Sequence, residues 1–355
     1  MTFDDWKADF LTRSGFPAEL ADWLVHLPAP TKADATQVEA RKTLKQYLDL
    51  TVSQARIAKG QAFLAKMDFS QIKAHHDVDP ALLLAIWGME TNFGAVLGDV
   101  AVFGALATLA AQGRRRAMFE DQLMAAADMV DQGIDPATLV GSWAGAIGHT
   151  QFMPRSWIRF AQTAGDDLPD LIGRPMDAML SSAGYLAAHG AQSNQPWGGT
   201  ATGPLTGTLE KARHADAMPL AGWKALGVHA AVPDGMYRFI LPAGVDGPGF
   251  LVTGTYDAVL AYNHADAYAL AVCHLADRIK GGPAWDGPWP TDTRALSVTE
   301  MAALQSALTK LGFDTQGADG FTGPNTIKAI EAYQRAQGLP VDGFAGVALL
   351  GRLVG

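Results

Sequence analysis

Glu90 is the residue whose surroundings in the sequence point most directly to chemistry. It stands near the end of the segment DVDPALLLAIWGMETNFG, which is apolar on nearly every side if it forms a helix. Ile86 and Trp87 precede it by four and three residues, so they share its face of that helix. Poor solvation raises the pKa of a carboxyl above its usual value of about 4.3. We therefore predict that Glu90 acts as a general acid and base near neutral pH. The alternative interpretation is a glutamate at a frayed helix end that points into water.

A glycine-rich segment supplies a second set of candidate residues. The stretch GSWAGAIGHTQFMPRSW, residues 141–157, contains three glycines before Gln151. Because glycine lets a backbone approach a neighbouring segment or a ligand closely, this loop could line a groove. The alternative is an ordinary turn before a helix that starts near Pro154.

A third segment combines tyrosine and asparagine at the entry to a predicted helix. The stretch AYNHADAY, residues 261–268, contains Tyr262, Asn263 and Tyr268. The alternative role for Asn263 is that of a simple helix cap.

The spacing of apolar residues along the chain predicts that most of the elements that position these candidate residues are helices. Asp79 and Pro80 have the residue types of a helix start, with aspartate as cap and proline at the first helical position. A closing helix is predicted from Ala265 to Ile279. The other predicted helices are 36–67, 80–93, 100–112, 115–132 and 176–189. Short apolar runs predict strands at 237–241, 249–253 and 256–262. The expected plan is a mainly α (α+β) protein, a helical body with a small β insertion at about 196–262.

The pattern at the end of the chain indicates a separate small domain. The stretch GGPAWDGPWPTDTR, residues 281–294, has no helical or strand period and predicts a linker between a domain at 1–280 and one at 295–355. Three short helical patterns follow it. The first starts with a capping box of Ser297 and Glu300. Its predicted buried residues are Met301, Leu304, Leu308 and Leu311.

Composition excludes several classes of partner and cofactor. A net charge of −9 argues against a broad electrostatic grip on nucleic acid or anionic lipid. The single cysteine, Cys273, allows neither an internal disulfide nor a thiolate zinc site. The nine histidines show no metal-ligand spacing, so we predict no metal and no cofactor. No apolar run approaches the roughly 18 residues of a membrane span, and the N-terminal segment lacks the pattern of a signal peptide.

The three candidate segments together resemble the lytic murein transglycosylases of the membrane-bound transglycosylase B type. The resemblance rests on IWGMETNFG, SWAGAIGHTQFMPRSW and YNHADAYALAV, which occur in the order of that family, and it covers essentially residues 1–280. The last part resembles a three-helix peptidoglycan-binding domain through LGF, DGFTGPNT and AIEAYQRAQGLPVDG.

This resemblance implies a lysozyme-like helical catalytic domain that cleaves the β-1,4 bond between MurNAc and GlcNAc. It implies that Glu90 is the catalytic acid and base, and that Ser142 and Asn263 hold the N-acetyl group of the muramoyl sugar. The remaining groove positions that it implies are Gln151, Tyr262, Tyr268 and, in a looser motif where a core tyrosine is the alternative, Tyr47.

A single carboxylate suffices if the substrate's own N-acetyl oxygen stabilises the developing cation. Glu90 would protonate the leaving oxygen and then accept the proton of the sugar's 6-hydroxyl, which gives a 1,6-anhydro end without water. One alternative is a hydrolytic muramidase with Asp99 or Asp166 as second carboxylate. The other is a wall-binding protein without catalysis.

Two positions depart from the family pattern. This chain has His149 and Thr150 where relatives often have Tyr-Gly, which puts substrate contacts in question. Some relatives carry a calcium loop after the groove motif. Here the stretch AQTAGDDLPDLIGRPMD lacks the alternating oxygen ligands of such a loop, so we predict no structural calcium. The expected partner is the glycan strand of peptidoglycan. We expect a monomer, located in the periplasm or cell envelope if an export signal has been removed.

Overall fold

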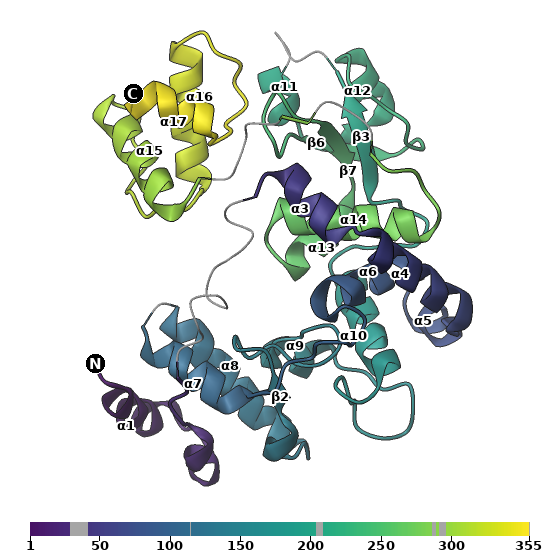
Figure 1. Cartoon of the computed structure of the whole chain (residues 1–355), viewed down its shortest axis with the longest axis vertical. Helices are drawn as coiled ribbons and strands as arrows, with labels where there is room; N and C mark the ends of the chain where they lie inside the picture. The colour runs from purple at the N-terminus through teal and green to yellow at the C-terminus, as the bar shows by residue number, and fades with distance from the viewer. Residues whose placement is uncertain (29–41, 114, 204–208, 286–288, 291–295, 355) are drawn as a thin grey trace. The chain divides into compact units, whose positions relative to one another are not determined.

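The computed structural model describes residues 1–28, 42–113, 115–203, 209–285, 289–290 and 296–354 (Figure 1). The chain divides into two compact units, Met1–Ala35 with Gln54–Ala188 and Thr36–Ser53 with His189–Gly355. Parts of two predicted segments, the helix at 36–67 and the linker at 281–294, lie outside the described residues. The predicted domain boundaries remain predictions.

The first unit consists almost entirely of helices. They are α1 Phe3–Ser14, η1 Ala18–Trp23, α4 Gln54–Lys66, α5 Ser70–His75, α6 Pro80–Thr91, α7 Val102–Ala111, α8 Arg116–Asp131, η3 Pro136–Thr138, α9 Pro154–Phe160 and α10 Pro175–Ala188. Two short antiparallel strands, β1 Val100–Ala101 and β2 Val140–Gly141, pair in the same unit.

Helix α6 is buried along most of its length, as its sequence predicts. Every residue from Ala81 to Gly88 is buried. The helix starts because the Asp79 carboxylate accepts a hydrogen bond from the amide of Ala81 at 2.9 Å and Pro80 needs no amide partner there. In the unit it packs against α4 and α10. A helix enclosed in this way gives a fixed end on which to place a polar side chain.

The prediction of one helix over 36–67 is wrong within the described residues. Helix α3, Leu44–Thr51, ends before α4 begins at Gln54, and the two fall in different units. The break follows from three successive poor helix formers, Thr51, Val52 and Ser53. The Thr51 hydroxyl also turns back onto the backbone and donates to the carbonyl of Tyr47 at 2.7 Å.

The second unit combines a small antiparallel sheet with helices. The sheet has the strand order β4-β6-β7-β3-β5, and its strands are β3 Gly198–Thr202, β4 Met218–Pro219, β5 His229–Ala230, β6 Met236–Ile240 and β7 Gly249–Val252. The helices beside α3 are α11 Leu209–Arg213, α12 Leu220–Ala225, α13 Gly254–Tyr262 and α14 Asp266–Ile279. Strands β6 and β7 confirm two of the three predicted strands, and α14 confirms the closing helix.

The third predicted strand, 256–262, is wrong because this segment is helix α13. A short apolar run fits a buried strand and a buried helix equally well, so periodicity does not separate them. A local signal decides for the helix. The Thr253 hydroxyl oxygen accepts from the amide of Thr255 at 3.2 Å, which is an N-terminal cap.

The last part of the second unit is a three-helix arrangement with its own core. Its helices are α15 Val298–Lys310, α16 Pro324–Ala336 and α17 Val347–Val354. Leu304, Leu308 and Ile330 are fully buried at its centre. The predicted capping box at Ser297 is confirmed. The predicted burial of Leu311 is wrong, because Leu311 is the residue that follows α15 and is 57% exposed.

Charged side chains connect this three-helix part to α11 within the second unit. The carboxylate of Glu331 on α16 is buried and lies 3.4 Å from the guanidinium of Arg213 and 3.1 Å from the imidazole of His214. One helical turn further on, Arg335 pairs with Glu210. The C-terminal helices are thus held against the sheet-containing part by complementary charge.

Candidate active site

Glu90 occupies the last turn of α6 and is half-buried. The residues from Ala81 to Gly88 are enclosed, whereas Met89 and Glu90 are partly exposed. The geometry agrees with the expected placement of this carboxylate at the edge of an apolar core. The half-buried side chain can therefore be reached from outside.

The chain reverses direction immediately after Glu90. Asn92, Phe93 and Gly94 all have left-handed backbone conformations, with φ values of 51°, 61° and 79°. Such a conformation is costly for a bulky residue such as Phe93 and persists only where the surroundings enforce it. The Phe93 ring folds back onto Gly88, where a Cβ atom would lie only 2.8 Å from the ring. It also packs against Trp87, with ring centroids 5.6 Å apart.

His149 connects the glycine-rich segment to this end of α6. The Trp87 indole Nε1 donates to the His149 Nδ1 at 3.0 Å. The Thr91 hydroxyl donates to the His149 carbonyl oxygen at 2.7 Å and accepts from the Gly94 amide at 3.0 Å. A Cβ atom on Gly94 would lie 2.6 Å from the His149 ring, so the ring rests directly on the backbone of that turn.

The electrostatic environment keeps the His149 imidazole neutral. The residue is only 8% exposed, and burial lowers the pKa of its ring, an effect that the negative charge of Asp170 partly offsets. Because Nδ1 accepts from Trp87, the proton of the neutral ring resides on Nε2. This contact between residues 62 positions apart is a feature that the sequence did not predict.

The glycines of the loop are required by close backbone approach. A Cβ atom would lie 2.0 Å from the Ala146 carbonyl oxygen at Gly141 and 2.1 Å from the Leu171 carbonyl oxygen at Gly148. In the segment before β1, a Cβ at Gly98 would lie 2.2 Å from the Gly141 oxygen. The glycine-rich pattern therefore reflects close approach of the loop to neighbouring backbone, one of the two roles that the sequence allows for it.

Ser142 has a local partner as well as a free donor hydrogen. Its hydroxyl oxygen accepts from the Ala146 amide at 3.1 Å, and its own amide donates to the Ala146 carbonyl at 2.8 Å. The side chain is half-buried. An oxygen that accepts in this way still carries a hydrogen that it can donate outward.

Gln151 adopts a left-handed conformation with φ of 53°. Its Nε2 donates to the carbonyl of Leu97 at 3.2 Å and to that of Gly148 at 3.0 Å. One amide hydrogen therefore joins the glycine-rich loop to the segment that follows α6, and the other is used within the loop. The Oε1 atom is the part of Gln151 that is left to interact with a ligand.

The other candidate residues belong to the second unit. Asn263 is exposed and follows α13 as its C-terminal cap residue, so its backbone does not cap α14, which starts after Ala265. Tyr262 is half-buried, and Tyr268 is buried in α14.

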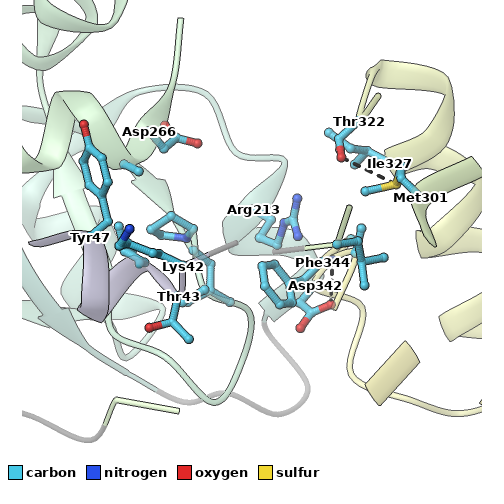
Figure 2. A pocket seen from close by; sticks show the side chains of 18 residues that line it. Lys42, Thr43, Tyr47, Arg213, Asp266, Met301, Thr322, Ile327, Asp342 and Phe344 are labelled. Carbon is cyan, nitrogen blue, oxygen red and sulfur yellow. Dashed lines mark hydrogen bonds between the residues drawn. The ribbon is translucent and has the colours of Figure 1, made fainter. Parts of the chain in front are cut away.

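Tyr47 on α3 is also buried, and it lines a cavity of about 410 Å³ within the second unit. Figure 2 shows Tyr47 and Asp266 on one side of this cavity and Asp342 with Phe344 on another. Arg213, which pairs with Glu331, also lines it. The cavity therefore has both charged and apolar walls.

Neither alternative carboxylate has a buried position. Asp99 and Asp166 are both exposed. In the first turn of α10 the carboxylate of Asp177 is buried, and it accepts from the backbone amides of Ala164 and Asp170 and pairs with Arg174 at 3.0 Å. Among the residues that the structure describes, no group of three or more His, Cys, Asp or Glu side chains could hold a metal ion.

Comparison with known protein families assigns the chain to one of these families. A family model described as a transglycosylase SLT domain matches residues 8–277, well over half of the sequence. The chain belongs to the SLT transglycosylase family. A second model, a putative peptidoglycan binding domain, matches residues 297–353 of this SLT transglycosylase.

Solved and curated relatives agree with that assignment. SltB3 from Pseudomonas aeruginosa, in complex with NAG-anhNAM-pentapeptide, is 37% identical to this SLT transglycosylase, with a TM-score of 0.89 over 99% of both chains. SltB1 from the same organism is 26% identical, with a TM-score of 0.66 over 79% of this chain and 98% of its own. Membrane-bound lytic murein transglycosylase B of Escherichia coli (strain K12) is 31% identical over 215 residues. That match covers 58% of this chain and 58% of the relative.

These findings confirm the predicted family, the mainly helical fold class with a small sheet, and the C-terminal peptidoglycan-binding domain. The roles predicted for individual residues of this SLT transglycosylase remain proposals. Three of them, Glu90, Ser142 and Gln151, lie in the first unit, and the others lie in the second.

Proposed function

We propose that this chain is a lytic transglycosylase that cleaves the β-1,4 bond between MurNAc and GlcNAc in peptidoglycan and leaves a 1,6-anhydroMurNAc end. The observation that carries the proposal is the family match over residues 8–277, within which Glu90 is a half-buried carboxylate at the end of an enclosed helix. The ligand of the 37% identical relative SltB3, NAG-anhNAM-pentapeptide, contains the anhydro sugar that this reaction forms.

The reaction needs only one carboxyl group. Glu90 in its acid form donates a proton to the glycosidic oxygen while the bond from that oxygen to the anomeric carbon breaks. The acetamido oxygen of the muramoyl sugar stabilises the positive charge on that carbon, as in substrate-assisted glycosidases. The 6-hydroxyl of the same sugar then attacks the anomeric carbon, and its proton returns to Glu90. No water is consumed, and Glu90 is regenerated.

Three neutral side chains assist the reaction in this proposal. Ser142 can donate its hydroxyl hydrogen outward while its oxygen accepts from Ala146. Asn263 is exposed and has a side-chain amide donor. For each of these two residues we propose a hydrogen bond to the acetamido group of the substrate, and for Gln151 a role of its Oε1 as an acceptor. For Tyr47, Tyr262 and Tyr268 we propose contacts with the glycan.

The C-terminal helices would retain the enzyme on its polymeric substrate, in line with the peptidoglycan-binding domain matched at residues 297–353. Among the described residues no helix combines the length and apolar character needed to cross a membrane. The proposed substrate places the site of action in the cell envelope, and we propose that the protein works there as a monomer.

The test is digestion of purified sacculi with the wild type and with Glu90→Gln, followed by mass analysis of the soluble muropeptides. We expect anhydro ends with the wild type, lighter than reducing ends by one water, and no soluble products with Glu90→Gln. Glu19→Gln, the same chemical change at an exposed position of the same unit, serves as control and should retain activity. Reducing ends would indicate a hydrolytic muramidase, and absence of cleavage by the wild type would indicate a binding protein.

A further inference from the structure

We propose that His149 is a positioning residue that fixes Glu90 by holding the last turn of α6 through Trp87 and Thr91. The inference rests on the proposed function, because it assigns Glu90 as the group that must be held. It concerns a residue that the resemblance did not give a role and that departs from the tyrosine common in the family. All contacts that carry it lie within the first unit.

His149 makes several independent contacts with its surroundings. The His149 ring accepts from the Trp87 indole at 3.0 Å, and its carbonyl accepts from the Thr91 hydroxyl at 2.7 Å. Its amide donates to the Leu171 carbonyl at 2.9 Å. Trp87 and Thr91 lie three residues before and one residue after Glu90, so His149 contacts α6 on both sides of that carboxylate.

These contacts also hold a strained turn in place. The three successive left-handed residues after Thr91 each cost on the order of 1 kcal/mol or more unless glycine occupies the position. Thr91 accepts from the Gly94 amide, and the His149 ring rests on Gly94 itself. His149 therefore contacts both the end of α6 and the strained turn that follows it. Without it, the last turn of α6 could fray, as helix ends do when their contacts are lost.

Proton transfer to a glycosidic oxygen requires the carboxyl to lie within hydrogen-bond distance of that oxygen, and a displacement of about 1 Å can lower the rate roughly 100-fold. The protonation state of His149 suits this role in holding the Glu90 carboxyl. Burial lowers the pKa of the ring and keeps it neutral, so Nδ1 can accept from Trp87. A cationic ring would carry a hydrogen on Nδ1 that faces the indole hydrogen.

The experiment compares His149→Leu, which removes the acceptor, with His149→Asn, whose Oδ1 can accept in place of Nδ1. Both are assayed for turnover of short glycans and for binding to sacculi. We expect His149→Leu to lower kcat roughly 10- to 100-fold with KM changed less than about 3-fold. His149→Asn should restore most of kcat. Trp87→Phe, which keeps the ring packing on Phe63 and Phe93, should lower kcat similarly, and the double variant Trp87→Phe with His149→Leu should be no worse than either single variant.

A matched control separates positioning from general loss of stability. Trp223→Phe in the second unit removes another buried indole hydrogen bond, from Nε1 to the Tyr237 carbonyl at 2.8 Å. It should lower the melting temperature and leave kcat of the folded enzyme unchanged. Wild-type kcat in folded His149→Leu, or equal loss in His149→Asn and His149→Leu, would overturn the proposal. Trp87→Phe provides the decisive measurement if His149→Leu does not fold. Failure of the proposed function would instead appear as a wild type that forms no anhydro products.

Discussion

The Thr91 hydroxyl donates a hydrogen bond to the His149 carbonyl oxygen at 2.7 Å. Thr91 directly follows the proposed catalytic glutamate in α6, and His149 belongs to the glycine-rich loop 58 residues later. Thr91 is 1% exposed, and His149 is 8% exposed. Hydrogen bonds between enclosed groups hold a geometry closely, because a broken bond leaves two polar atoms without water.

Thr91→Val should therefore destabilise the protein and slow the reaction. The substitution keeps the shape but leaves the His149 carbonyl and the Gly94 amide without their partner, which costs roughly 2 kcal/mol in unfolding free energy. We expect kcat to fall at the same time. Thr91→Ser keeps the hydroxyl and should retain kcat. Urea unfolding measures the loss of stability, and turnover of short glycans measures the loss of rate. An unchanged kcat in Thr91→Val would show that the Thr91 hydroxyl does not help to position Glu90.

Ser142→Ala and Asn263→Ala should each lower the rate more than the affinity. If these residues stabilise charge that grows on the acetamido group, each accounts for on the order of 100-fold in rate. Asn263 is exposed, so its substitution should leave stability unchanged. Asn263→Asp has nearly the same size but lacks the amide donor and should be as slow as Asn263→Ala.

Steady-state kinetics on short glycans, with a binding assay on sacculi, provides the measurement for both positions. Rates within a few-fold of the wild type in both alanine variants would contradict substrate assistance. The search for a second carboxylate would then start with Asp99 and Asp166.

The stability of the protein should fall in acid partly because of His274. This residue on α14 is 7% exposed and stacks on Trp285 with ring centroids 4.1 Å apart. Burial lowers the pKa of its ring from 6.5 to about 4, and the charge of Arg278 contributes in the same direction. The unfolded chain then binds more protons between these values. The contribution of His274 to the unfolding free energy is complete above about pH 6.5. It decreases by up to about 3 kcal/mol as pH falls towards 4.

The variant His274→Phe retains an aromatic ring for Trp285 and cannot titrate. We expect its unfolding free energy to fall less than that of the wild type between pH 7.5 and 4.5. His229→Gln, at an exposed histidine, is the control and should follow the wild type. Identical pH profiles for His274→Phe and the wild type would show that this histidine is protonated without cost.

Deletion of residues 295–355 should weaken binding to sacculi and leave turnover of short glycans unchanged. These residues have their own core around Leu304 and Ile330. Their loss removes one of two binding parts, which typically lowers affinity for a polymer by about 100-fold. The deletion also removes the partner of the partly buried Arg213, so melting temperature should be measured alongside. Loss of short-glycan turnover in a folded deletion variant would show that the two parts act as one unit.

The sequence predicts those parts of the fold and site that depend on local signals. The start of α6 follows from Asp79 and Pro80, and the capping box from Ser297 and Glu300. The strand predicted at 256–262 is wrong because its apolar run is compatible with both kinds of element. The contact of Trp87 with His149 could not be predicted from the sequence for a different reason. It joins residues that only the tertiary fold brings together.

The absence of space beside Gly98, Gly141 and Gly148 bears on how this family can diversify. Loops are ordinarily where sequences drift fastest, because their side chains face water. Here the loop backbone is packed so closely that not even a methyl group fits at these positions. Such a loop should change over evolution as slowly as a core helix. New preferences would then arise at residues such as Ala144, which is exposed.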